Sequence, residues 1–179
     1  MTEQTNNFDY LQSFIDEMKE SSSGNYKIET IKKHSDSEFL QKIFNYTYNP
    51  YKKYNVTSKN CKKNSELLGH ANTYGSIFTL LDDLANRVCT GHNAIANVNR
   101  FILENIQYED LIFNIIDRDL KMGASTSSIN KVIPGCIPTF KVALANPYNV
   151  KRVDFQSGDW YGSRKLDGVR CICRKENDI

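Results

Sequence analysis

Apolar side chains recur at steps of three and four residues along the front of the chain, a spacing that predicts helices with one buried face. The first such stripe covers residues 8–18 and is broken by the Ser-Ser-Ser-Gly run at residues 21–24. A second helix is expected to begin at a capping box, with Ser35 as the N-cap and Glu38 three positions later. It is expected to end near Tyr48, just before an Asn-Pro pair.

Further apolar stripes predict four more helices. One opens at Ser76 and places Val88 on its apolar side, with Gly91 expected as a left-handed C-terminal cap. The others are expected at residues 92–106 and 108–122, and at 126–132 with Ser125 as the N-cap.

The character of the chain changes near residue 141. Residues 141–144 are strand-like, residues 147–158 form a polar connector, and residues 160–178 read as two strands with their turns. We therefore predict a mainly α protein, with an all-helical domain at residues 1–140 and the first strands of an α+β domain at residues 141–179. Two or three strands do not make a stable domain, so the second domain is expected to be incomplete.

Composition narrows the classes of protein to which the chain could belong. Its 23 Lys and Arg nearly balance 21 Asp and Glu, so binding to nucleic acid by bulk charge alone is disfavoured. The chain has no apolar run of bilayer length and no secretion signal, so no membrane association is expected. Five cysteines without metal-ligand spacing predict reduced thiols, an intracellular, cytoplasmic location and no metal site of their own.

A KxDGxR hexapeptide near the end of the chain is formed by Lys165, Asp167, Gly168 and Arg170. Gly168 would make the tight turn between two strands, and Lys165 would project into a pocket from the end of one of them. This arrangement suits attack by a lysine amine on a phosphate, because a pocket can lower the lysine pKa so that the amine loses its proton. The neighbouring charges of Arg164 and Arg170 would favour the same shift and attract a nucleotide. A solvated lysine before an ordinary Asp-Gly hairpin turn fits the hexapeptide equally well.

The hexapeptide KLDGVR resembles motif I of the covalent nucleotidyltransferases, which comprise DNA ligases, RNA ligases and mRNA capping enzymes. Residues 118–145 are similar to the join between the helical DNA-binding domain and the adenylation domain of ATP-dependent DNA ligases of the T-even bacteriophage type. The pieces that carry this resemblance are Arg118-Asp119-Leu120, Gly123-Ala124-Ser125, Asn130-Lys131-Val132, Pro134-Gly135 and Ile137-Pro138, in that order. Segments near residues 47 and 72 are also similar, so the resemblance extends from about residue 35 onward.

The resemblance implies a catalytic role for Lys165 and an ATP-dependent reaction. Lys165 would attack the α-phosphate of ATP and hold AMP, which then passes to the 5′-phosphate of a nick in duplex DNA before the strand is sealed. Arg170 would contact the nucleotide, while Asp167 and Gly168 would shape the turn. Arg164 lies where the family places backbone contacts to adenine. Such an enzyme serves DNA replication, repair and recombination as a monomer, and can be virus-encoded and act inside the host cell.

The helical domain offers two candidate DNA contacts. Gly123, Ala124 and Ser125 lead into a helix whose first amides suit a backbone phosphate, and Asn130 and Lys131 on that helix would reach the same strand. A bland helix-loop-helix with a glycine cap fits these residues as well. A basic tract interleaved with tyrosines also suits a duplex backbone or, equally, a solvated loop; its lysines are Lys52, Lys53, Lys59, Lys62 and Lys63.

The polypeptide of 179 residues is expected to be inactive by itself. The resemblance places the Mg²⁺ ligands and the lysines that grip the α-phosphate in segments beyond Ile179. We therefore expect that incubation with labelled ATP and Mg²⁺ leaves no label on Lys165 after denaturation, and stable labelling would contradict this expectation. Two other functions remain open at this point: a non-enzymatic DNA-binding module, and another covalent nucleotidyltransferase, either an RNA ligase or a capping-type guanylyltransferase that prefers GTP.

Overall fold

A computed structural model describes residues 3–68, 74–139, 156, 158 and 161 of the chain. The chain divides into two units, Met1–Phe140 and Lys141–Ile179, and nearly all of the described residues belong to the first. The strands expected after residue 140 and the residues of the KxDGxR hexapeptide lie outside the described residues. The assignment of the two domains therefore stays a prediction.

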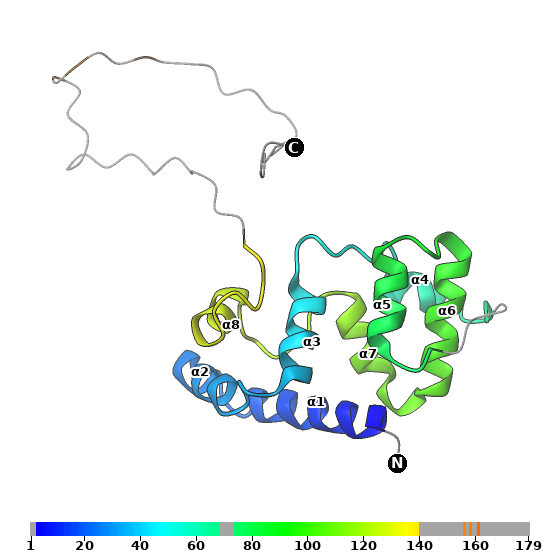
Figure 1. Cartoon of the computed structure of the whole chain (residues 1–179), viewed down its shortest axis with the longest axis horizontal. Coiled ribbons are helices and arrows are strands. Elements are labelled where there is room, and N and C mark those ends of the chain that lie inside the picture. The colour runs from blue at the N-terminus through cyan, green and yellow to red at the C-terminus, as the bar shows by residue number, and fades with distance from the viewer. Residues whose placement is uncertain (1–2, 69–73, 140–155, 157, 159–160, 162–179) are drawn as a thin grey trace. The chain divides into compact units, whose positions relative to one another are not determined.

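The regular elements in the described part of the first unit are all helices, joined by loops and turns. Its elements are α1 (Glu3–Lys19), α2 (Gly24–Lys33), α3 (Glu38–Tyr48), α4 (Ser58–Lys63), α5 (Ile77–Ala85), α6 (Gly91–Glu104), the 3-10 helix η1 (Ile106–Tyr108), α7 (Glu109–Ile116) and α8 (Thr126–Val132). α1 runs along one side of the unit, with α2 and α8 at one end and α5 and α6 at the other (Figure 1). None of the described helices is long and apolar enough to cross a membrane.

One hydrophobic core runs through the helical unit. The α1 residue Phe14 packs edge-on against Phe44 of α3, with ring centroids 5.8 Å apart, and both are almost completely buried. Phe8, one end of the same α1 stripe, contacts Phe101 of α6 at 6.5 Å and Tyr108 at 5.0 Å. Burying each such ring stabilises the fold by about 1.5–3 kcal/mol. The buried face of α1 therefore packs against α3, α6 and Tyr108.

Several helix boundaries confirm the sequence prediction. α8 covers the predicted residues 126–132, and its cap Ser125 accepts a hydrogen bond from the Ser128 amide at 3.2 Å. α3 ends at Tyr48 as predicted, and α6 agrees closely with residues 92–106. Helices with a regular spacing of apolar residues can thus be predicted from sequence, and an N-cap residue or an Asn-Pro pair helps to place their ends.

The N-cap of α3 was predicted at the wrong serine. Ser37, and not Ser35, accepts the hydrogen bond from the Leu40 amide, at 3.3 Å. The Ser35 hydroxyl instead donates to the Lys32 carbonyl at 2.8 Å, at the end of the preceding helix. Two serines two positions apart offer the same side chain, and the end of α2 decides which one caps α3.

Two predicted helices are shorter in the structure. α5 ends at Ala85, so Val88 lies outside it and is 71% exposed. Gly91 has the expected positive φ of 57°, but it begins α6 and does not cap α5. α7 ends at Ile116, because Arg118 has a left-handed φ of 65° that a helix does not contain. The helices α2 and α4 were not predicted at all, and both are short and rich in polar residues.

Polar side chains tie α1 to the end of α2. The Lys33 ammonium donates to Oε1 of Glu17 at 2.9 Å, and Nε2 of His34 lies 3.0 Å from Oε2. Nδ1 of His34 also bonds the Tyr10 hydroxyl at 2.8 Å. These bonds fix the angle between the first two helices.

We expect this tie to be pH-dependent. The bonds from Lys33 and then His34 hold the pKa of Glu17 below its usual range. A depressed carboxyl pKa stabilises the fold above the unfolded-state value, and this contribution is lost as the pH falls through the folded-state pKa. Glu17→Gln should therefore lower the melting temperature at pH 7, and the deficit should shrink as the pH falls toward 3, as measured by thermal unfolding across that range.

Asp16→Asn provides the control for this prediction. Asp16 precedes Glu17 on α1, and its only ion pair in the described part of the chain is a distant one of 3.9 Å with Lys19. Its replacement should change the melting temperature little at either pH. A Glu17→Gln deficit of equal size at pH 3 and pH 7 would contradict the role assigned to the carboxylate.

Candidate nucleic-acid interface

The loop before α8 has the geometry expected for close approach of a ligand. Gly123 is exposed and has a φ of 66°, a region that favours glycine. Ala124 packs partly against the core, while Ser125 caps α8 and bonds the hydroxyls of Ser127 and Ser128 at 2.8 and 3.0 Å. The structure thus brings the three predicted loop residues to one exposed turn, and their contact with DNA stays a prediction.

Asn130 and Lys131 have different roles in the described part of the chain. The Asn130 amide donates to the Ile137 carbonyl at 2.7 Å, and its oxygen accepts from the Ile137 amide at 2.9 Å. Asn130 therefore closes the loop that follows α8. Lys131 is exposed and forms no ion pair with another described residue. Contact of either residue with DNA stays a prediction.

Two lysines of the basic tract lie close to acids on other helices. Lys52 lies 3.1 Å from Asp82 of α5, and its ammonium sits 4.0 Å from the centre of the Tyr46 ring. Lys53 is exposed. The other three lysines lie on α4, where Lys62 is 3.9 Å from Asp110 and 4.8 Å from the ring of Phe113. The sequence showed no acid inside the tract, but α5 and α7 supply acids from a distance.

Arg118 is part of the structural frame of this region. Its guanidinium donates to the carbonyls of Thr47, Asn49 and Lys52, at 3.3, 2.5 and 3.1 Å. The Leu120 amide donates to the hydroxyl of Tyr48 at 3.2 Å, and burial raises the pKa of that phenol to about 12. Arg118 and Leu120, both from the Arg-Asp-Leu piece of the motif, therefore join the end of α3 to the segment that leads to α8 by hydrogen bonds.

Lys27 was missed by the sequence analysis because α2 itself was missed. The residue is 9% exposed, and its ammonium donates to the carbonyls of Met18 and Met122 at 3.0 and 2.6 Å. It thereby joins the end of α1 to the residue before Gly123. A lysine within a short polar stretch carries no local signal of burial, so only the packing of α2 against α8 reveals it.

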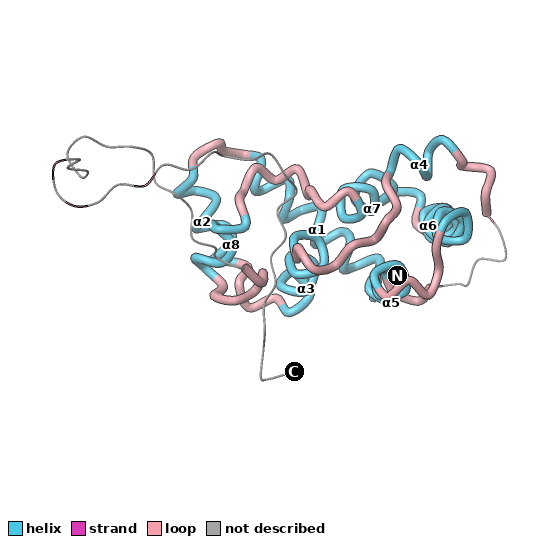
Figure 2. Tube along the Cα trace, turned by 90° about the horizontal axis from the view of Figure 1, so that it is seen from above, coloured by secondary structure: helices cyan, strands magenta, loops and turns pink. Residues whose placement is uncertain are grey.

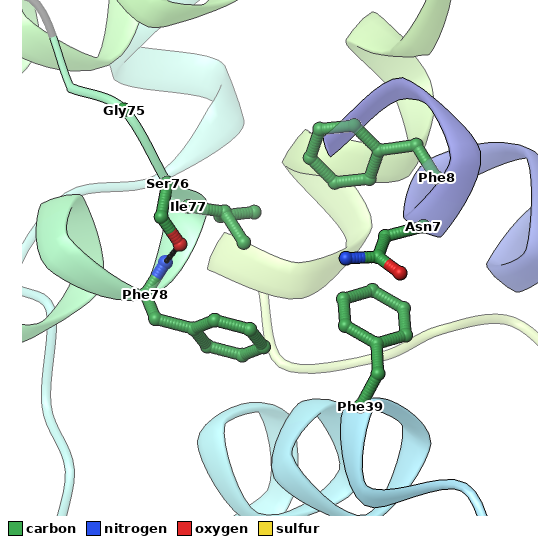
Figure 3. Close-up of a pocket in the computed structure, with 7 residues that line it drawn as sticks. All are labelled: Asn7, Phe8, Phe39, Gly75, Ser76, Ile77 and Phe78. Carbon is green, nitrogen blue, oxygen red and sulfur yellow. Dashed lines mark hydrogen bonds between the residues drawn. The ribbon is translucent and has the colours of Figure 1, made fainter. Parts of the chain in front are cut away.

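A separate pocket of about 250 Å³ lies between α1, α3 and the start of α5 (Figure 3). The rings of Phe39 and Phe78 line it with centroids 5.8 Å apart, and Asn7 and Ser76 contribute polar groups. It contains none of the residues predicted to bind nucleotide or DNA. Its rings also belong to the packing between α3 and α5.

The described cysteines are buried or half-buried thiols. Burial raises the pKa of Cys61 to about 12 and also raises that of Cys136. Such thiols stay protonated at neutral pH and are poor nucleophiles and metal ligands. Among the residues that the structure describes, no three His, Cys, Asp or Glu side chains gather as a metal site. The predicted nucleotide site, Lys165 with Arg164, Asp167, Gly168 and Arg170, lies outside those residues.

Two phage DNA ligases are similar to this chain in sequence. The chain is 28% identical over 177 residues to the DNA ligase of Enterobacteria phage T4, and the match covers 94% of this chain and 35% of the relative. The DNA ligase of Enterobacteria phage T6 matches to the same extent. The chain is similar to phage DNA ligases. No family model matches it.

This match confirms the resemblance to T-even phage DNA ligases that the sequence motifs indicated. At 94% coverage it cannot be confined to the helical unit and must extend into residues 141–179. The chain spans about a third of the length of these phage DNA ligases.

Proposed function

We propose that this chain forms the DNA-holding part and the nucleotide-attacking segment of an ATP-dependent DNA ligase. The observation that carries the proposal is the match to two phage DNA ligases along nearly the whole chain. The ordered motif pieces at residues 118–138 and the KLDGVR hexapeptide support it independently of overall identity. The substrate would be a nick in double-stranded DNA.

The helical unit would bind the backbone of the duplex. Lys131 and Lys53 are exposed cations, and the turn at residues 123–125 is open to solvent at Gly123 and Ser125. Contacts of this kind with phosphates fix the position of a protein on DNA without reading the bases. An enzyme that must act on a nick in any sequence needs binding of this kind.

Lys165 would carry out the chemical step. The uncharged amine attacks the α-phosphorus of ATP, so that a phosphorus–nitrogen bond forms, the bond to the bridging oxygen breaks and pyrophosphate leaves. The amine loses its proton and Lys165 holds AMP. The 5′-phosphate of the nick then takes the AMP and frees the lysine, and the 3′-hydroxyl displaces AMP to form the phosphodiester. Mg²⁺ is expected to accompany ATP and to neutralise charge on its phosphates.

Binding to nicked duplex tests the role of the helical unit. The chain, titrated into a fluorescent nicked duplex between 50 and 200 mM salt, should show an affinity that falls steeply with salt. Lys131→Ala and Lys53→Ala should each weaken binding and each reduce the slope of log affinity against log salt by about one. Lys52→Ala, a matched control, should leave the slope nearly unchanged because Asp82 already pairs with that ammonium. Absence of salt-dependent binding by the unmodified chain would refute the proposal.

Transfer of AMP tests the role of Lys165. The chain can replace the matching third of the phage T4 DNA ligase, and the hybrid can be incubated with labelled ATP. We expect label on the protein that survives denaturation, and its loss in Lys165→Arg, because an arginine side chain stays protonated and does not attack phosphorus. Labelling from GTP and not ATP would favour a guanylyltransferase. A folded hybrid that binds nicked DNA but takes no label would favour a DNA-binding module.

A further inference from the structure

The environment of Lys27 differs from that of an ordinary buried lysine. A lysine ammonium has three N–H donors, and in the described part of the chain two of them reach carbonyls, those of Met18 and Met122. None of the carboxylates in that part pairs with it. Lys27 is therefore a buried lysine without a carboxylate partner among the described residues, although buried lysines are normally paired.

The Lys27 ammonium lies directly beside Gly123. A Cβ atom built on Gly123 would lie 2.7 Å from Nζ of Lys27, closer than side chains normally approach. Gly123 itself is exposed. Because glycine has no side chain, the ammonium can lie this close to an exposed position of the chain, and any other residue at position 123 would have to displace it.

Hydroxyl and amine donors follow Gly123 along the chain. Ser125 and Ser127 carry exposed hydroxyls on the same turn, and Lys131 follows one helical turn later. α2, which carries Lys27, packs against α8, so both cations belong to one side-by-side pair of helices (Figures 1 and 2). This combination of charge and hydroxyl donors suits a phosphate group.

We propose that Lys27 binds a DNA backbone phosphate on the side where its ammonium lies beside the exposed Gly123. The inference rests on the proposed function, and adds to it a residue that neither the sequence motifs nor the comparisons indicate. Because Lys27 is only 9% exposed, water and salt screen its charge less than that of a surface lysine. Its contribution to binding is therefore larger than that of Lys131, and the free chain holds the cation in place by its two carbonyl contacts.

Three single variants of the chain test this in the nicked-duplex titration. Lys27→Met removes the charge and keeps the length of the side chain, and should weaken binding about tenfold and reduce the salt slope by about one. Gly123→Ala keeps the charge but places a Cβ atom where the ammonium now lies and displaces it, and should weaken binding to a similar extent. Lys32→Met is the matched control, since it removes an exposed charge from the same helix and should have a much smaller effect. Circular dichroism and thermal unfolding establish that each variant is folded.

A double-variant cycle separates binding from a purely structural role. If Gly123→Ala weakens binding by displacing the Lys27 ammonium, it should not weaken binding further in a chain that already carries Lys27→Ala. A folded Lys27→Met that binds like Lys32→Met would overturn the inference while leaving the proposed function intact. If Lys27→Met does not fold, undiminished binding by Gly123→Ala overturns it instead. A chain that does not bind nicked DNA at all refutes the proposed function, and the inference with it.

Discussion

Arg118→Ala is expected to lower the free energy of unfolding by about 3 kcal/mol, a large effect for a half-buried residue. The guanidinium donates to three carbonyls, of which those of Thr47 and Asn49 lie at the C-terminal end of α3. The last carbonyls of a helix have no partner within it, and they carry the negative end of its dipole. Alanine would remove this donor from all three carbonyls, although that of Asn49 would keep its bond from the Lys52 amide at 3.2 Å.

Arg87→Ala is a closely matched control. Arg87 also has a left-handed φ, of 60°, but it is exposed and its side chain forms no hydrogen bond to another described residue. The same substitution at the same backbone geometry should therefore change stability by less than about 0.5 kcal/mol. Urea unfolding of the two variants measures the difference. Equal destabilisation by both would show that the backbone at these positions, and not the three bonds of Arg118, determines the effect.

Asn130→Asp is expected to destabilise the fold by about 2–4 kcal/mol at pH 7. Asn130 donates to the carbonyl of Ile137 and accepts from its amide, so the amide group of the side chain matches both backbone atoms. A carboxylate keeps the second bond but places a negative oxygen against the carbonyl. The variant should partly recover as the pH falls toward 4, where a protonated carboxyl again donates a hydrogen bond.

Lys131→Asp introduces a negative charge at the next residue and serves as the control. Its side chain is exposed, so the effect on unfolding by urea should be small at every pH, while DNA binding should fall. The opposite pattern, a stable Asn130→Asp and an unstable Lys131→Asp, would contradict the roles that the structure assigns to the two residues.

The helices that sequence predicted correctly have a regular apolar stripe, and two of them also have a clear start or stop signal. α8 follows Ser125 directly, and α3 ends before an Asn-Pro pair. α2 and α4 carry no such stripe, because much of their surface faces solvent and one of the few buried side chains of α2 is a lysine. Short helices of this kind gain their stability from packing, and a local pattern does not contain that information.

The candidate interface shows the same division. The turn at residues 123–125 and the exposure of Lys131 follow from residue type and from the place of each residue beside a helix. The pairing of Lys52 with Asp82 joins residues 30 positions apart, and the Asn130 bonds close a loop that carries no periodic signal. The sequence does not show whether a lysine or an asparagine is bonded within the fold or exposed to a ligand.

The sequence by itself predicted that this chain is mainly helical, where its main helices lie and that it resembles phage DNA ligases. Caps, apolar stripes and motif spacing involve residues close together in sequence, so they can be recognised without the structure. Packing of distant segments decided which polar groups are committed to the fold. Met18, Lys27 and Met122 come from three separate stretches, and their contact exists only once α1, α2 and the turn before α8 are assembled. A contact between residues so far apart leaves no sequence pattern near either of them. The position of the Lys27 ammonium beside Gly123 is therefore decided by the tertiary structure alone.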